Sequence, residues 1–100
     1  MPVNARAAAS ETAVVRLEAL GAELLRLGWQ SRLDIAAGRL PNLLVQAPVT
    51  APSARAETIY CALRIDGWWF WWSWATPIAE EPADAARAIV QTLRSAEDAS

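Results

Sequence analysis

The sequence predicts a small α+β domain: a four-stranded antiparallel sheet with the N- and C-terminal helices packed on one face, in the order α-β-β-β-β-α. Segments near both ends of the 100-residue chain repeat apolar residues at helical spacing, whereas central segments alternate apolar and polar residues as strands do. A Trp-rich segment is divided by Asp66-Gly67, a favoured hairpin turn. This length suits one domain, which we expect to span residues 11–96, with a disordered N-terminal arm at 1–10 and a frayed C-terminus at 97–100.

The first helix is expected to begin after Ser10, whose hydroxyl can accept a backbone N–H of the first turn. Its buried face is predicted from apolar residues three or four positions apart: Val14, Leu17, Leu20, Leu24 and Leu27. Arg16 falls on another face and can remain solvated. Gly28 ends the helix, and Gly21 allows close packing on the sheet. Trp29 is then expected to pack over the sheet edge.

Two strands with a period of two are expected next. Their apolar positions are Leu33 and Ile35 in the first strand and Leu43, Val45 and Ala47 in the second. Gly38-Arg39 can reverse the chain between them. Pro41 and Pro48 cannot donate to a strand ladder, so they either bracket the second strand or place it at the edge of the sheet. The segment 48–56 has two prolines and no periodicity, which predicts a loop.

The Asp66-Gly67 turn predicts a hairpin and fixes its register, because both residues of such a turn need a positive φ. On one face this register pairs only apolar residues: Ile65 with Trp68, Leu63 with Phe70, Cys61 with Trp72, and Ile59 with Trp74. On the opposite face it pairs Arg64 with Trp69, Ala62 with Trp71, Tyr60 with Ser73, and Thr58 with Ala75. A slip of one residue would destroy this sorting.

The chain is expected to leave the sheet after Thr76-Pro77 and to form a second helix from Pro82. Proline suits the first turn of a helix, and the charges of Glu80 and Glu81 favour a helix N-terminus. The apolar stripe of this helix consists of Ala86, Ile89, Leu93 and Ala96.

The composition excludes several kinds of chemistry. Without His, and with a single Cys, the chain has no imidazole catalyst, no His- or Cys-cluster metal site and no internal disulfide. A net charge of −2 gives no electrostatic surface for nucleic acid or an anionic membrane. The apolar run from Trp68 to Ala79 is too short to span a membrane, and no secretory signal is visible. We therefore expect a cytoplasmic protein with no cofactor and no catalytic residue, in which Cys61 is buried and inert.

The aromatic residues carry the functional signal, because five of the six Trp lie between Trp68 and Trp74. Those on the apolar face of the hairpin are expected to be core. The candidate interaction face is the opposite one, with Tyr60, Arg64, Trp69 and Trp71. Arg64 can stack on Trp69 as a cation over a ring, and exposed Trp and Tyr are typical of contact surfaces. Alternatively, the arm at 1–10 or the loop at 48–56 folds over these rings.

Three motifs resemble those of small Trp-rich cytoplasmic proteins of actinobacterial genomes. They are Leu-Gly-Trp at 27–29, Leu-Pro-Asn-Leu-Leu-Val at 40–45 and Gly-Trp-Trp-Phe-Trp-Trp-Ser-Trp at 67–74. The resemblance covers roughly Leu17 to Leu93. It implies a small cytoplasmic domain and carries over no catalytic residue.

The first functional hypothesis is a non-enzymatic protein-interaction module that binds a partner protein, or a second copy of itself as a homodimer, through the Tyr60, Arg64, Trp69 and Trp71 face. The alternative is a small-ligand binder, in which stacked Trp side chains grip a sugar, a base or a cationic group. An enzyme is the third and least favoured class, because the sequence shows no catalytic constellation.

Overall fold

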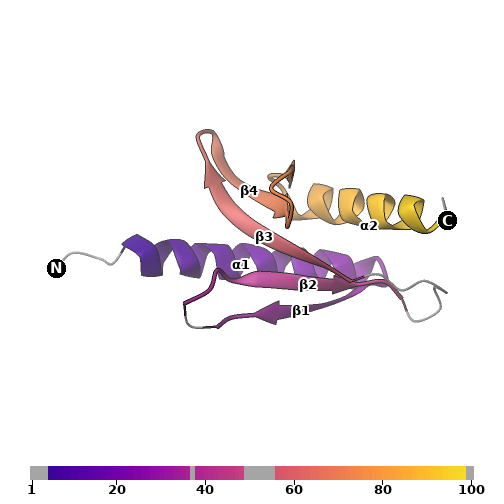
Figure 1. The fold of residues 1–100 in the computed structure, drawn as a ribbon, viewed down its shortest axis with the longest axis horizontal. Helices are drawn as coiled ribbons and strands as arrows, with labels where there is room; N and C mark the ends of the chain where they lie inside the picture. Colours follow the sequence, from indigo (N-terminus) through magenta and orange to yellow (C-terminus); the bar gives the residue numbers. More distant parts are fainter. Residues whose placement is uncertain (1–4, 37, 49–55, 99–100) are drawn as a thin grey trace.

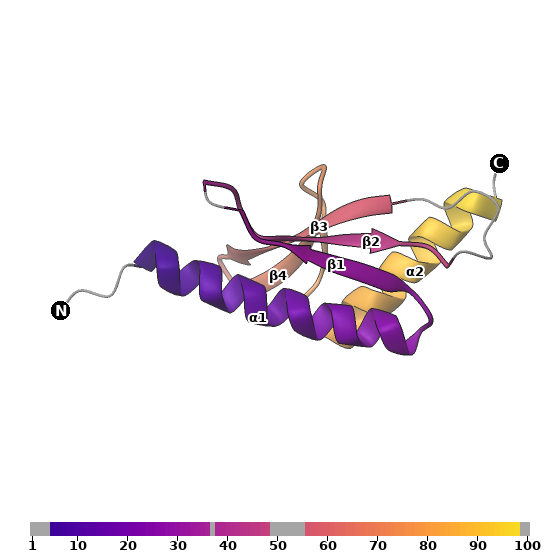
Figure 2. The ribbon, with the colours of Figure 1, turned by 90° about the horizontal axis from the view of Figure 1, so that it is seen from below.

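The computed structural model describes residues 5–36, 38–48 and 56–98 of the chain (Figure 1). Its elements are α1 (Ala5–Arg26), β1 (Gln30–Asp34), β2 (Asn42–Gln46), β3 (Ala56–Arg64), β4 (Gly67–Trp72), β5 (Pro77–Ala79) and α2 (Pro82–Asp98). The strands form one antiparallel sheet in the order β1-β2-β3-β4-β5. Both helices pack on the same face of this sheet and on each other (Figure 2). We call this face the inner face and the opposite one the outer face. The predicted α+β class is confirmed, with five strands in place of four.

The additional strand, β5, lies where we expected the chain to leave the sheet. Pro77–Ala79 runs back along β4, and a bulge at Phe70 and Trp71 interrupts the pairing. The connecting turn is tight: Ala75 has a φ of 64°, and the Trp72 N–H donates to the Thr76 carbonyl at 2.9 Å. A strand of three residues is too short to show the alternation by which strands are predicted.

Helix α1 begins at Ala5, so Ser10 lies within the helix and is not its N-cap. Alanine has the highest helix propensity, which allows a helix to form here without apolar periodicity. The arm expected at 1–10 is therefore helical from Ala5, and residues 1–4 lie outside the described residues. The buried face consists of Ala13, Leu17, Leu20 and Leu24, whereas Val14 is half-buried and Leu27 is exposed.

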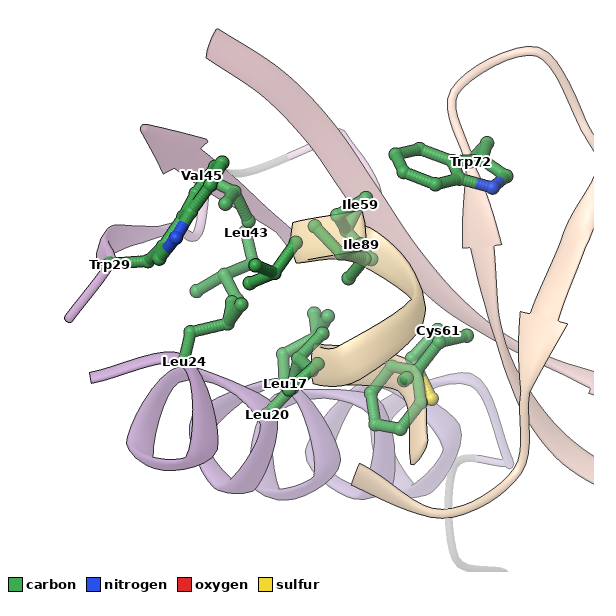
Figure 3. Packing of buried hydrophobic residues seen from close by; sticks show 14 of the residues in the cluster. Leu17, Leu20, Leu24, Trp29, Leu43, Val45, Ile59, Cys61, Trp72 and Ile89 are labelled. Atoms are coloured by element: carbon green, nitrogen blue, oxygen red, sulfur yellow. The ribbon is translucent and has the colours of Figure 1, made fainter. Parts of the chain in front are cut away.

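The end of α1 brings the helix close to the sheet. Gly28 has a φ of 84°, the left-handed conformation expected at a helix end. Gly21 faces β1 so closely that an added Cβ would lie 3.0 Å from Ser31 Oγ, which confirms the predicted close packing. Trp29 precedes the edge strand β1 and is buried beside Val45 (Figure 3).

The two strands predicted before the loop are confirmed as β1 and β2. Gly38, between them, has a φ of 79°, as a chain reversal requires. Strand β2 lies between β1 and β3, so Pro41 and Pro48 bracket an interior strand and do not mark an edge. Most of the loop expected at 48–56 falls on residues 49–55, outside the described part of the chain.

The β3–β4 hairpin turns one residue earlier than predicted, on Ile65-Asp66, with Arg64 opposite Gly67. Gly67 has a φ of 136°, whereas φ is not positive at Asp66. The positive φ that we assigned to both turn residues is thus needed only at the glycine that follows the turn. The observed pairs are Leu63–Trp68, Cys61–Phe70 and Ile59–Trp72 on the inner face, and Ala62–Trp69 and Tyr60–Trp71 on the outer face. Each partner shifts by two positions, and because this number is even, every residue keeps its predicted face.

The core fills the space between the inner face and the two helices (Figure 3). From the sheet it takes Leu43, Val45, Ile59, Cys61, Phe70 and Trp72, and from α2 it takes Ala85, Ala86, Ile89, Val90 and Leu93. Leu63, Ile65 and Trp74 were also expected there, but all three are exposed. The tip of the hairpin extends beyond both helices, so nothing in the described part of the chain covers Leu63 and Ile65 (Figure 1).

Candidate functional site

The four predicted interaction residues come together on the outer face of the β3–β4 hairpin. Tyr60 and Arg64 lie on β3, and Trp69 and Trp71 lie on β4. Tyr60 is directly opposite Trp71, and Ala62, between Tyr60 and Arg64, is opposite Trp69. The helices lie on the other side of the sheet, so the described part of neither helix covers these side chains (Figure 2).

The Arg64 guanidinium lies over both tryptophans of this face. Its central carbon is 4.7 Å from the centroid of the Trp69 ring and 5.8 Å from that of Trp71. Both distances are within the ~6 Å range of a cation–π contact. The stacking on Trp69 is as predicted, whereas the contact with Trp71 is additional. Gly67 stands opposite Arg64 and has no side chain of its own to occupy the space toward Trp69.

The two indole rings are held by different means. The Trp71 N–H donates to the Ala62 carbonyl at 3.3 Å, which fixes the orientation of that ring against β3. The indole nitrogen of Trp69 is buried and has no hydrogen-bond partner within the described residues. Both residues are half-buried, as are Tyr60 and Arg64. The face is therefore only partly open to solvent. The alternative in which the arm or the loop covers this face involves the side chains of residues 1–10 and 49–55. These side chains lie outside the described part of the chain.

The outer face continues across β2 to β1 in one row of facing residues. This row is Asp34, Asn42, Tyr60 and Trp71. Next to it lies a hollow of about 280 Å³, lined by Arg39, Leu40, Asn42 and Tyr60. Asn42 is 7% exposed and its amide donates to the Leu40 carbonyl at 3.2 Å, while Arg39 and Asp34 form an ion pair at 2.9 Å. This hollow was not predicted from the sequence. Side chains alternate between the two faces along β2, and its even-numbered residues lie on the outer face. This alternation is the signal that would have placed Asn42 there.

Arg16, which the sequence pattern allowed to remain in solvent, is held against the sheet. It is half-buried on the inner face, where its guanidinium donates to the carbonyl of Trp68 at 3.2 Å and to that of Glu80. Its central carbon also lies 5.3 Å from the centroid of the Phe70 ring. Arg16 is next to the apolar stripe of α1 in the helix. The long aliphatic part of its side chain can therefore pack along the core while the guanidinium reaches polar groups beyond it. Arg16 thus ties α1 to β4 and to the connection between β5 and α2.

Cys61 is 8% exposed on the inner face, as predicted. Burial raises the pKa of its thiol from the ordinary value of 9.0, and the nearby Arg16 opposes this only in part. A thiol with a raised pKa is a poor nucleophile at neutral pH. In the described part of the chain, no group of three His, Cys, Asp or Glu residues could hold a metal ion. The described residues also include no helix with the length and apolar character needed to cross a membrane.

No family model, curated protein or solved structure matches this chain. The likeness of its three motifs to actinobacterial proteins stays a prediction. A proposal for the function therefore rests on the outer face itself.

Proposed function

We propose that this domain is a non-enzymatic interaction module that binds a second copy of itself through the outer face. The observation that carries the proposal is the position of Tyr60, Trp69 and Trp71 on the side of the sheet away from both helices. A solvated strand face is served equally well by Thr or Arg, so folding alone does not require large aromatic rings there. Covering such rings is favourable by about 25 cal/mol per Å² of apolar area.

The size of the face bears on a second copy as the occupant. Its five strands hold 28 residues in all, so at about 3.3 Å per residue and about 4.8 Å between strands the flat area of the face is about 440 Å². Stable interfaces bury roughly 600–1,000 Å² on each partner. A two-fold contact of that size therefore needs the relief of the side chains on this face and the surface beside it. The apolar surface also continues beyond the aromatic rings to Leu40, which is 70% exposed.

The charges around the aromatic rings are also compatible with a copy of the same face. Arg64 pairs with Asp66, and Arg39 pairs with Asp34, so these two pairs contribute no net charge. A face with a net charge would repel its own copy in a two-fold contact, because like charges then meet. Local pairing removes the repulsion that Arg39 and Arg64 would otherwise cause.

Sedimentation of the wild-type chain and of the Trp69→Ser, Trp71→Ser double variant tests the proposal. We expect a dimer for the wild type, and a folded monomer for the double variant by sedimentation and circular dichroism. Trp74→Ser is the matched control, because Trp74 is 54% exposed and stacks on the inner-face residue Trp72 at 4.8 Å. That variant should remain a dimer. A monomeric wild type over a wide concentration range would overturn the second copy as the occupant.

Ligand binding at the same face is the second candidate function, and one observation favours it. The Trp69 and Trp71 rings already hold a cation, the Arg64 guanidinium. The hollow beside Tyr60 adds little to this candidate, because its volume of about 280 Å³ is below the ~300–1,000 Å³ of ordinary ligand pockets. The ligand that this candidate implies is therefore a cation bound by indole rings.

A further inference from the structure

We infer that Trp69 and Trp71 form a binding site for the guanidinium group of an arginine side chain, and that Arg64 is the displaceable occupant of this site in the free domain. The inference deepens the second candidate function and does not depend on self-association. It rests on three features: the placement of the rings, the weak hold on Arg64 and the chemistry of the group that the rings already contact.

The rings are placed before any external cation arrives. Trp71 is fixed by the hydrogen bond from its indole N–H to the Ala62 carbonyl, and the Trp69 ring is half-buried. The residue opposite Trp69 is Ala62, which is exposed and carries only a methyl group. No bulky side chain therefore competes with a cation at that cross-strand position. A site whose groups are already in position loses little conformational freedom on binding.

Arg64 is held only weakly in this position. Apart from the ring contacts, its one polar contact within the described residues is the ion pair from Nε to the Asp66 carboxylate at 3.5 Å. Both side chains are substantially exposed, at 35% and 50%, so the pair is screened by water and contributes little. Rotation of the Arg64 side chain into solvent breaks no hydrogen bond to the backbone of the described residues. The rings are then free for another cation.

The resident group indicates which cation fits. A guanidinium is planar and weakly hydrated, so it stacks on an indole with a smaller desolvation penalty than a compact ammonium. The Asp66 carboxylate, now without Arg64, can pair with the incoming charge. The matched neutral probe is citrulline, which has nearly the same shape as arginine and no charge.

The experiment titrates the Arg64→Ala variant with L-argininamide and follows the indole N–H signals of Trp69 and Trp71 by NMR. We expect a saturable shift of both signals with L-argininamide and none with L-citrullinamide at the same concentration. The wild type should require about three- to sixfold more L-argininamide, because Arg64 occupies the site for most of the time. No shift in Arg64→Ala, or an equal shift with L-citrullinamide, would overturn the inference.

Further substitutions in the Arg64→Ala background test whether L-argininamide binds at Trp69 and Trp71. Trp69→Leu with Trp71→Leu should abolish binding, whereas Trp74→Leu should retain it. If the double variant does not fold, Trp69→Phe replaces it, because a smaller ring binds cations more weakly; an unchanged affinity there would contradict the assigned site. Sedimentation of the wild type and of Arg64→Ala at the concentrations of the titration separates the two proposals. A monomeric wild type overturns the proposed dimer and leaves this inference to the titration. Because a second copy would cover the same rings, the titration is carried out at concentrations at which Arg64→Ala is a monomer, and the absence of a shift there overturns this inference alone.

Discussion

The two faces of strand β4 each carry an arginine over aromatic rings, but the two arginines are held in different ways. On the inner face, Arg16 lies 5.3 Å from the Phe70 centroid and donates to two backbone carbonyls. On the outer face, Arg64 lies 4.7 Å from the Trp69 centroid and pairs only with the exposed carboxylate of Asp66 within the described residues. The ring contacts are similar. The two arginines therefore differ in their hydrogen-bond acceptors. Backbone carbonyls hold the structural Arg16, whereas an exposed carboxylate leaves Arg64 exchangeable.

The largest expected difference between the faces concerns their tryptophans. Trp72 is 7% exposed on the inner face, and Trp72→Ala should destabilise the fold by about 3–5 kcal/mol, as other large aromatic residues do when they are removed from a core. Trp71→Ala should cost much less in the monomer, because that ring is open to solvent on one side. Urea unfolding of both variants measures the difference. Equal losses would contradict the assignment of faces.

Arg16→Met should have the next largest effect. Methionine keeps the apolar stem but leaves the carbonyls of Trp68 and Glu80 without this donor, which costs about 1–3 kcal/mol. The control is Arg26→Met on the same helix, where the arginine is 77% exposed and pairs only with Glu23 at 3.5 Å. Its unfolding free energy should change by less than about 0.5 kcal/mol. Similar values for both variants would rule out a structural role for Arg16.

Cys61 gives the inner face a dependence on alkaline pH. Its pKa is raised above 9.0 in the folded state, so above pH 9.0 the unfolded chain loses the thiol proton first and binds fewer protons than the native chain. Stability should therefore fall as pH rises above 9.0, with a slope of at most about 1.4 kcal/mol per pH unit. The same comparison for Cys61→Ala should lack this contribution. Identical pH profiles for the two chains would show that the thiol does not contribute.

Native Cys61 should also react slowly with a thiol reagent, and rapidly once the chain is unfolded, because burial suppresses the thiolate. Fast labelling of the native protein would mean that the inner face of β3 opens readily.

Arg64→Ala should have the smallest effect on stability, below about 1 kcal/mol, because it removes an exposed cation–π contact and a screened ion pair. Thermal unfolding of this variant beside Arg16→Met compares the two arginines directly. If Arg64→Ala lost as much stability as Arg16→Met, Arg64 would be a structural arginine as well, and the two arginines would not differ in role.

The sequence was sufficient for the fold class and for the members of the outer face, because alternation assigns each hairpin residue to a face whatever the exact turn. It was not sufficient for the register. The dipeptide Asp66-Gly67 fits either a turn on both residues or a turn that ends before the glycine, and the φ of Asp66, which is not positive, distinguishes them. The exposure of Leu63 and Ile65 was also hidden, because periodicity does not show how far a hairpin extends beyond its helices.

The position of Arg16 could not be predicted for a related reason. Helical spacing gives the direction in which a side chain leaves the helix, but not where a long flexible stem ends. The carbonyls that hold Arg16 lie 52 and 64 residues away in the chain, and their approach follows from the packing of α1 against the sheet and α2. The hollow at Asn42 likewise needs the β1–β2 connection in place.

The order of the strands has a consequence for the synthesis of the chain. Every strand pairs with its neighbour in sequence, so the sheet can form step by step as the chain is extended. Helix α1 is different, because it precedes every element on which it packs, and α2 comes last. At about 5–20 residues per second, the 55 residues between Arg26 and Pro82 take several seconds to synthesise. During that time the apolar face of α1 lacks its complete binding surface and is open to chaperones.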